Sequence, residues 1–107
     1  MSLFGTLNTG ASGLGVSSAS MSVIGDNIAN INTTGFKGMQ ASFADMMPNS
    51  IGGLNGSNQM GSGAAMAANM TLFGQGTVSG SDSALDMAIS GKGFFQVSGE
   101  DGADYYT

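Results

Sequence analysis

The sequence predicts an α+β fold: a long N-terminal helix of the coiled-coil type, an extended connector, and antiparallel β-strands of an incomplete β-rich domain. Two observations predict it. Apolar residues recur in heptads through the first 31 residues, whereas apolar and polar or small residues alternate over residues 84–89. We expect a core helix in residues 1–32, a connector in residues 33–70, and the start of the β-rich domain in residues 71–107.

The predicted helix has an apolar seam made of two rows of residues spaced by seven. Together the rows alternate four and three apart, as the a and d positions of a heptad do. From Leu3 to Ile31 such a helix would be about 44 Å long. We expect seven residues, called here the heptad seam, to pack against other helices: Leu3, Leu7, Leu14, Met21, Ile24, Ile28 and Ile31.

A second, weaker apolar stripe runs through Val16, Ala19 and Val23, which indicates more than one neighbour. Five glycines between residues 5 and 25 each cost about 1 kcal/mol of helix propensity relative to Ala. Packing must therefore stabilise the helix. We expect it to be frayed in a monomer and helical on assembly, and an ordinary core helix of a small domain is the alternative.

An Asn-rich run, residues 27–37, follows the heptads and has the residues that end a helix. Asn competes for backbone hydrogen bonds and tolerates left-handed conformations. Gly35 is predicted to adopt a positive φ after the last turn. The residues of this signature turn are Asn27, Asn30, Asn32, Thr33, Gly35, Phe36 and Lys37.

Downstream of this turn, the pattern changes from helical to extended. Residues 39–47 are predicted to be a turn or short helix ended by Pro48, and residues 49–63 a flexible loop. From Ala64 the chain becomes extended, with strands predicted at residues 84–89, 94–97 and 103–107 and a hairpin loop at residues 99–102. Because the sequence ends within a predicted sheet, we expect a fragment of a longer protein.

Charge is scarce, with seven acidic residues, two lysines, no arginine and a net charge of −5. Such a chain cannot neutralise a phosphate backbone, so no nucleic-acid partner is expected. Only 8% of residues are charged, which favours burial of much of the surface in an assembly. The N-terminus lacks the basic region of a cleaved signal peptide, and no apolar run predicts membrane insertion.

The sequence offers little for catalysis, because it has neither His nor Cys to serve as an imidazole base or a thiolate. Asp82 and Asp86 are expected to flank a turn and an exposed strand face. The acidic residues of 100–104 lack the ligand spacing of a calcium loop. We expect no enzyme activity, no catalytic residue, no cofactor and no metal.

Three blocks of sequence resemble the flagellar rod and hook axial family. They are residues 14–37, with the Asn-rich turn, residues 41–46 (ASFADM), and residues 85–97 (LDMAISGKGFFQV), which are followed by Tyr106 and Thr107. The second block resembles hook more than distal rod. The resemblance implies a structural subunit of the hook, a helical tube that couples motor torque from rod to filament. A rod subunit is the alternative within the family, and a small monomeric binding domain is the alternative from another class.

The resemblance also implies partners and a location. Expected partners are further copies of the chain, other axial proteins (rod, hook-filament junction and hook cap), and the type III export apparatus. The implied location is the extracellular hook and basal body of the bacterial flagellum, reached without a cleaved signal peptide. In this family the N-terminal helix pairs with a C-terminal helix, and the β-strands open the first outer domain.

Overall fold

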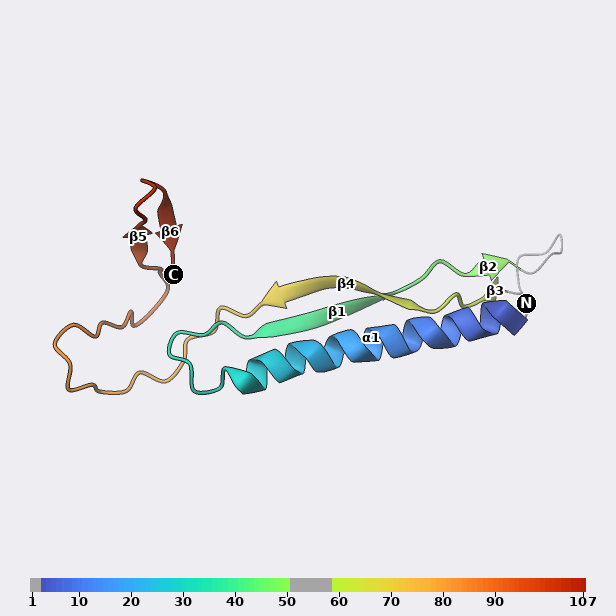
Figure 1. Cartoon of the computed structure of the whole chain (residues 1–107), viewed down its shortest axis with the longest axis horizontal. Helices are drawn as coiled ribbons and strands as arrows, with labels where there is room; N and C mark the ends of the chain where they lie inside the picture. The colour runs from blue at the N-terminus through green and yellow to red at the C-terminus, as the bar shows by residue number, and fades with distance from the viewer. Residues whose placement is uncertain (1–2, 51–58) are drawn as a thin grey trace. The chain divides into compact units, whose positions relative to one another are not determined.

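The structure, a computed structural model, describes residues 3–50 and 59–107. It comprises two compact units, one that extends to Phe73 and one that spans Gly74–Thr107. The first unit consists of a long helix and a β-hairpin, and the second contains a small hairpin (Figure 1). The predicted α+β class, with one long N-terminal helix followed by antiparallel strands, is therefore confirmed.

Helix α1 spans Leu3–Ala29, and its 27 residues correspond to a length of about 40 Å. The heptads predicted that the helix ends at Ile31, and α1 ends two residues earlier. The side-chain amide of Asn30 donates to the Asp26 carbonyl oxygen at 2.9 Å, and the Ile31 N–H donates to the Ile28 carbonyl at 3.2 Å. The Asn30 N–H keeps its helical bond to the Asp26 carbonyl, whereas the bond of Ile31 spans only three residues, so the chain turns at residues 30–32.

Strands β1 (Met39–Asp45) and β4 (Ala64–Thr71) form an antiparallel pair with a bulge between Ser42 and Phe43. The prediction of a turn or short helix at residues 39–47 was therefore wrong. The partner of β1 lies more than twenty residues downstream, and local propensity does not report such a pairing. The extended prediction from Ala64 is confirmed.

Two short strands, β2 (Asn49–Ser50) and β3 (Gln59–Met60), also pair antiparallel. The predicted flexible loop of residues 49–63 is thus wrong at both of these strands. Residues 51–58, which were part of that prediction, lie outside the described residues.

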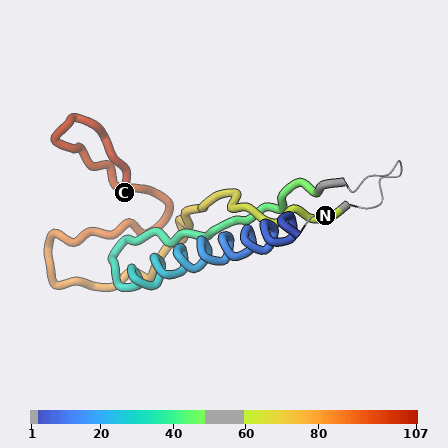
Figure 2. The backbone as a smooth tube through the Cα atoms, turned by 45° about the vertical axis from the view of Figure 1, so that its right-hand side comes forward, coloured from blue at the N-terminus to red at the C-terminus, as the bar shows by residue number. Residues whose placement is uncertain are grey.

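The β1–β4 hairpin lies along α1, as two views of the chain show (Figures 1 and 2). No residue of the described chain is fully buried, so this contact makes a thin interface without a closed core. Its half-buried helix positions are Gly5, Thr9, Ser12, Val16, Ala19, Ser20, Val23 and Asn27, and apart from Ser20 they recur four or three residues apart, as in a heptad. The second stripe predicted through Val16, Ala19 and Val23 therefore belongs to the hairpin side of α1.

In the second unit, β5 (Gln96–Ser98) pairs antiparallel with β6 (Asp104–Tyr106). Phe95 and Thr107 extend the pairing with two backbone hydrogen bonds, of 2.8 and 2.9 Å. The connecting turn is closed by the Gly102 N–H, which donates to the Gly99 carbonyl at 3.0 Å, and Gly102 has a φ of 73°. The predicted hairpin at the end of the chain is confirmed.

The strand predicted at residues 84–89 is absent from the structure. The Asp86 N–H donates to the Ser83 carbonyl in a turn, and the Ser81 hydroxyl bonds the Asp86 carboxylate. The Ile89 carbonyl accepts a hydrogen bond from the Gln75 side-chain amide instead of from a neighbouring strand. Apolar and small or polar residues do alternate here, but the backbone groups of Asp86 and Ile89 bond to a turn and to a side chain instead of to another strand.

Candidate assembly interface

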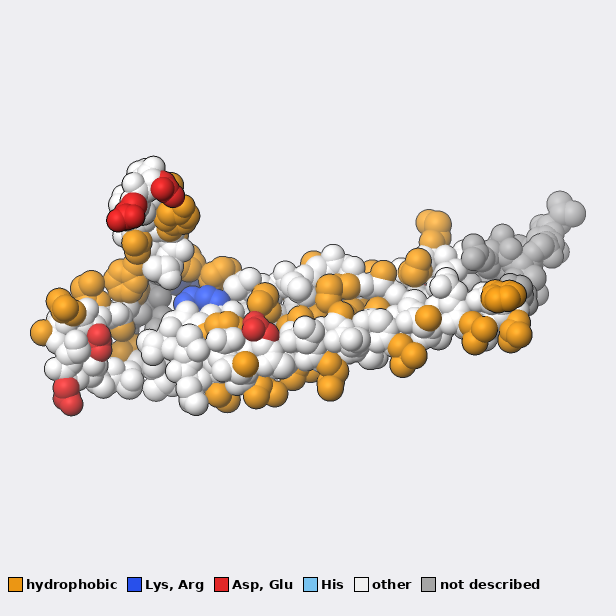
Figure 3. Space-filling view, in the orientation of Figure 1, with side chains coloured by type: hydrophobic (Ala, Val, Ile, Leu, Met, Phe, Trp, Pro, Cys, Tyr) orange, Lys and Arg blue, Asp and Glu red, His pale blue; other side chains and the backbone are white. Residues whose placement is uncertain are grey.

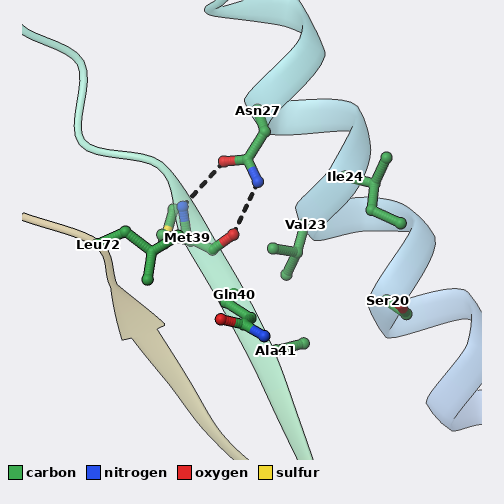
Figure 4. A pocket seen from close by; sticks show the side chains of 8 residues that line it. All are labelled: Ser20, Val23, Ile24, Asn27, Met39, Gln40, Ala41 and Leu72. Atoms are coloured by element: carbon green, nitrogen blue, oxygen red, sulfur yellow. Dashed lines mark hydrogen bonds between the residues drawn. The ribbon is translucent and has the colours of Figure 1, made fainter. Parts of the chain in front are cut away.

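Asn27 joins the last turns of α1 to the start of β1 with two hydrogen bonds. Its side-chain amide donates to the Met39 carbonyl at 2.7 Å, and its side-chain oxygen accepts from the Met39 N–H at 2.9 Å (Figure 4). A carboxamide has the same donor and acceptor as a peptide group, so Asn27 pairs with Met39 as a neighbouring strand would. A carboxylate has no donor and cannot reproduce both bonds.

The rest of the signature turn is a local network beyond the end of α1. The Thr33 hydroxyl bonds the Asn30 side-chain oxygen at 3.2 Å, and the Phe36 N–H donates to the Thr33 carbonyl at 3.3 Å. Gly35 has a φ of 73°, as predicted, and its carbonyl accepts from the Lys37 ammonium at 2.7 Å. These bonds hold the reversal that brings Met39 beside Asn27.

Two predicted turn residues contribute less to that network. Phe36 is half-buried, whereas Asn32 is exposed and makes no side-chain hydrogen bond within the described part of the chain. The turn therefore depends on five of the seven predicted residues through side-chain bonds or backbone conformation, namely Asn27, Asn30, Thr33, Gly35 and Lys37.

A second polar contact fixes the other end of the hairpin, at residues that the sequence did not single out. The Ser12 hydroxyl donates to the Thr9 carbonyl at 2.7 Å and accepts from the Ala64 N–H at 3.4 Å. Gly63 has a φ of 101°, and a Cβ at that position would collide with the Ser12 hydroxyl. Ser12 does follow the four-three spacing of Val16, Ala19 and Val23, and that spacing could have predicted that Ser12 lies on the same face of the helix.

Between the helix and the strands near Asn27 lies an open groove of about 380 Å³. Ser20, Val23 and Ile24 line it from α1, and Met39 and Ala41 line it from β1 (Figure 4). No charged side chain lines this groove. The groove is therefore an uncharged gap between α1 and the hairpin.

The heptad seam lies on a different flank of α1 and is open to solvent. Its side chains are exposed by 49% at Ile24 to 76% at Leu14 and Ile31, and Ile24 alone among them lines the groove. Hydrophobic side chains project along the edge of α1 away from the hairpin (Figure 3). The hairpin thus occupies one face of the helix and leaves the seam uncovered.

Nothing in the described residues points to metal or membrane chemistry. No group of three or more His, Cys, Asp or Glu side chains is placed to hold a metal ion. Over the same ranges, no helix combines the length and apolar content needed to cross a bilayer.

The chain was compared with protein families and curated proteins. The sequence model of the flagella basal body rod protein family matches residues 7–37, which contain most of α1 and the signature turn. The flagellar hook protein FlgE of Rhizobium meliloti is 41% identical over 107 residues, which is all of this chain and 25% of that protein. The hook protein FlgE of Helicobacter mustelae is 38% identical over 91% of this chain and 24% of its own length.

A rod protein matches at a similar level. The flagellar basal-body rod protein FlgG of Buchnera aphidicola is 38% identical over 89% of this chain and 40% of its own length. The chain thus spans a quarter to two fifths of the length of these curated relatives. With hook and rod proteins matching along nearly all of its residues, the chain belongs to the flagellar hook and rod protein family.

Proposed function

We propose that the chain is part of a structural subunit of the bacterial flagellar hook, a helical tube that passes torque from rod to filament. The observation that carries this proposal is the 41% identity to a hook protein along the whole chain. The exposed heptad seam supports it, because a continuous apolar stripe on a helix is a surface for packing against further helices.

The exposed apolar side chains support self-assembly. No residue of the described ranges is buried, and every side chain of the heptad seam is exposed by at least 49%. An exposed apolar stripe of this kind is typical of a subunit interface. We propose that the heptad seam of residues 3–31 supplies much of that interface, with further copies and other axial proteins of the flagellum as partners.

The proposal assigns a role to each region. Residues 1–32 serve as the core helix, residues 33–70 as the connector, and residues 71–107 as the start of an outer domain. Export through the type III apparatus without a cleaved signal, and a place in the extracellular hook, belong to the same proposal. No catalytic role is proposed, since the relatives are structural proteins.

A rod subunit is the second candidate. The match of the rod family to residues 7–37 and the 38% identity to a rod protein favour it. The Rhizobium meliloti hook protein is nevertheless matched over 100% of the chain at 41% identity, and the rod protein over 89% at 38%. The hook is therefore the leading proposal.

Chimeric proteins test the two candidates. The chain replaces the region it matches in the Rhizobium meliloti hook protein, and the chimera is expressed in a strain that lacks that protein. We expect hooks in electron micrographs. A matched chimera in a flagellar rod protein serves as the comparison. Rods restored without hooks would assign the chain to the rod, and a hook chimera that is exported but never polymerises would contradict the structural role.

A further inference from the structure

The β1–β4 hairpin has two outer edges, and α1 covers each of them at one end only. In an antiparallel pair, the backbone groups of alternate residues point to the partner strand and those of the others point away. The Gly38 carbonyl accepts from the Leu72 N–H at 2.8 Å, whereas both groups of Met39 bond Asn27. The odd-numbered residues of β1 therefore point outward.

The same alternation holds at the far end of the hairpin. The Met46 N–H donates to the Gly63 carbonyl at 2.9 Å, whereas the Ala64 N–H is bonded by Ser12 of the helix. Asn27 thus covers the start of β1, and Ser12 covers the start of β4. The edges toward the ends of both strands remain open.

Ala41 and Met66 also point outward, each toward the end of its strand that α1 covers, and four further residues have outward backbone groups on the open edges. The strand register opposes Met39 to Thr71 and Ala41 to Asn69, so Asn69 and Thr71 point outward on β4, and Phe43 and Asp45 point outward on β1. Within the described residues, none of the four has a hydrogen bond beyond the strand pair. Unpaired strand edges of this kind are templates for another strand.

We propose that the open edge of β4 pairs with the open edge of β1 from a second copy of the chain, and this proposal rests on the self-assembly proposed above. The pairing opposes Asn69 to Asp45 of the second copy and Thr71 to Phe43 of the second copy. The Asn69 amide is a donor for the Asp45 carboxylate, and a β-branched residue opposite an aromatic is a favourable cross-strand pair. All four open residues are used.

Charge and area favour a second copy as the partner. Residues 3–73 carry three charges only, at Asp26, Lys37 and Asp45, so a strongly charged partner has no counterpart there. Pairing of β1 with β1 would place two Asp45 carboxylates close together, which is unfavourable. The exposed apolar area of α1 and of the hairpin is available for an additional contact.

The geometry produces an open assembly. The two open edges lie at opposite ends of the hairpin, so each added copy is displaced along the strand direction. Two different surfaces meet, which makes the contact heterologous, and a heterologous contact with displacement extends as a helix instead of closing as a dimer. Because β1 and β4 run antiparallel, copies in the same orientation place β1 antiparallel to the neighbouring β4.

Disulfide trapping tests this pairing, since the chain has no cysteine of its own. One protein carries Asn69→Cys and the other Asp45→Cys, and they are mixed at an assembling concentration and oxidised. Within one copy these positions are about 15 Å apart, because Asp45 opposes Ala64, so a bond forms only between copies. The matched control replaces Asn69→Cys by Met70→Cys, whose side chain points to the opposite face.

We expect the cross-linked heterodimer to form roughly tenfold more from the Asn69 protein than from the Met70 control. Equal yields, or Asn69 cross-linking to itself and not to Asp45, would overturn the edge pairing. Sedimentation of the wild-type chain distinguishes failure of the edge pairing from failure of self-assembly. Polymers without the cross-link overturn the edge pairing alone, whereas a chain that stays monomeric overturns self-assembly as well.

Discussion

The carboxamide of Asn27 pairs with the backbone of Met39 in the manner of one residue of a β-strand. The two hydrogen bonds, of 2.7 and 2.9 Å, connect positions twelve residues apart on either side of the signature turn. Figure 4 shows the pair near Val23, which lines the same groove as Asn27 and Met39. The contact fixes where the hairpin starts along α1, and so determines which helix face remains open.

Removal of the Asn27 carboxamide should loosen the hairpin. We expect Asn27→Ala to lower the free energy of local opening by about 1–3 kcal/mol, the net contribution of two hydrogen bonds. Hydrogen exchange of the Leu72 amide, which bonds Gly38, measures it. Asn32→Ala is the control, because Asn32 makes no side-chain hydrogen bond in the described structure. Equal exchange rates in the two variants would remove the role given to Asn27.

A substitution at Gly63 should disturb the other end of the hairpin in two ways. We expect Gly63→Ala to cost about 1–3 kcal/mol, because its φ is positive and its Cβ meets Ser12. Adding Ser12→Ala should recover only part of this loss, since the clash is relieved and the backbone strain remains. Exchange of the Met46 amide, which bonds the Gly63 carbonyl, reports on both variants. Full recovery in the double variant would show that the backbone conformation contributes nothing.

Gly35 should be intolerant of a side chain. Its φ of 73° is left-handed, so Gly35→Val should destabilise the turn by roughly 1–2 kcal/mol or more, with a β-branched residue worse than Ala. Gly38→Ala is the matched control, because its added Cβ would make an ordinary contact at 3.6 Å with the Asn27 oxygen. Exchange of the Phe36 amide measures the turn. Similar protection in both variants would contradict the conformational requirement.

The helix and its two stripes could be predicted because they depend on local order. The heptads of Leu7, Leu14 and Met21 specify a helix face, and Gly35 specifies a turn, whatever the rest of the chain does. The end of the helix was less predictable, since α1 ends at Ala29 and the Ile31 N–H turns to the Ile28 carbonyl although Ile31 continues the heptads.

The strands were predicted less well, because pairing depends on residues far apart in the sequence. Strand β1 is formed by its pairing with β4, and the residue types at Met39 and Ala41 do not by themselves predict a strand. The alternation at Leu85, Met87 and Ile89 predicted a strand that does not form, since no strand lies beside it in the structure, and Leu85 and Met87 are exposed. Ser12 and Gly63 were missed for the same reason, as their contact spans 51 residues.

We propose that α1 has two faces with separate roles, one that contacts the hairpin and one for assembly. We expect Ile28→Asp to block self-association without unfolding the monomer, because Ile28 is 63% exposed in the seam and does not line the groove beside the hairpin. Val16→Asp is the converse control, and it should release the hairpin.

Sedimentation velocity over a range of concentrations tests this claim most directly, with exchange of the Leu72 amide followed in the same samples. The wild-type chain should grow in size with concentration, whereas Ile28→Asp should stay monomeric and keep wild-type protection at Leu72. Association of Ile28→Asp equal to that of the wild type would contradict the account, as would loss of Leu72 protection in the Ile28→Asp monomer.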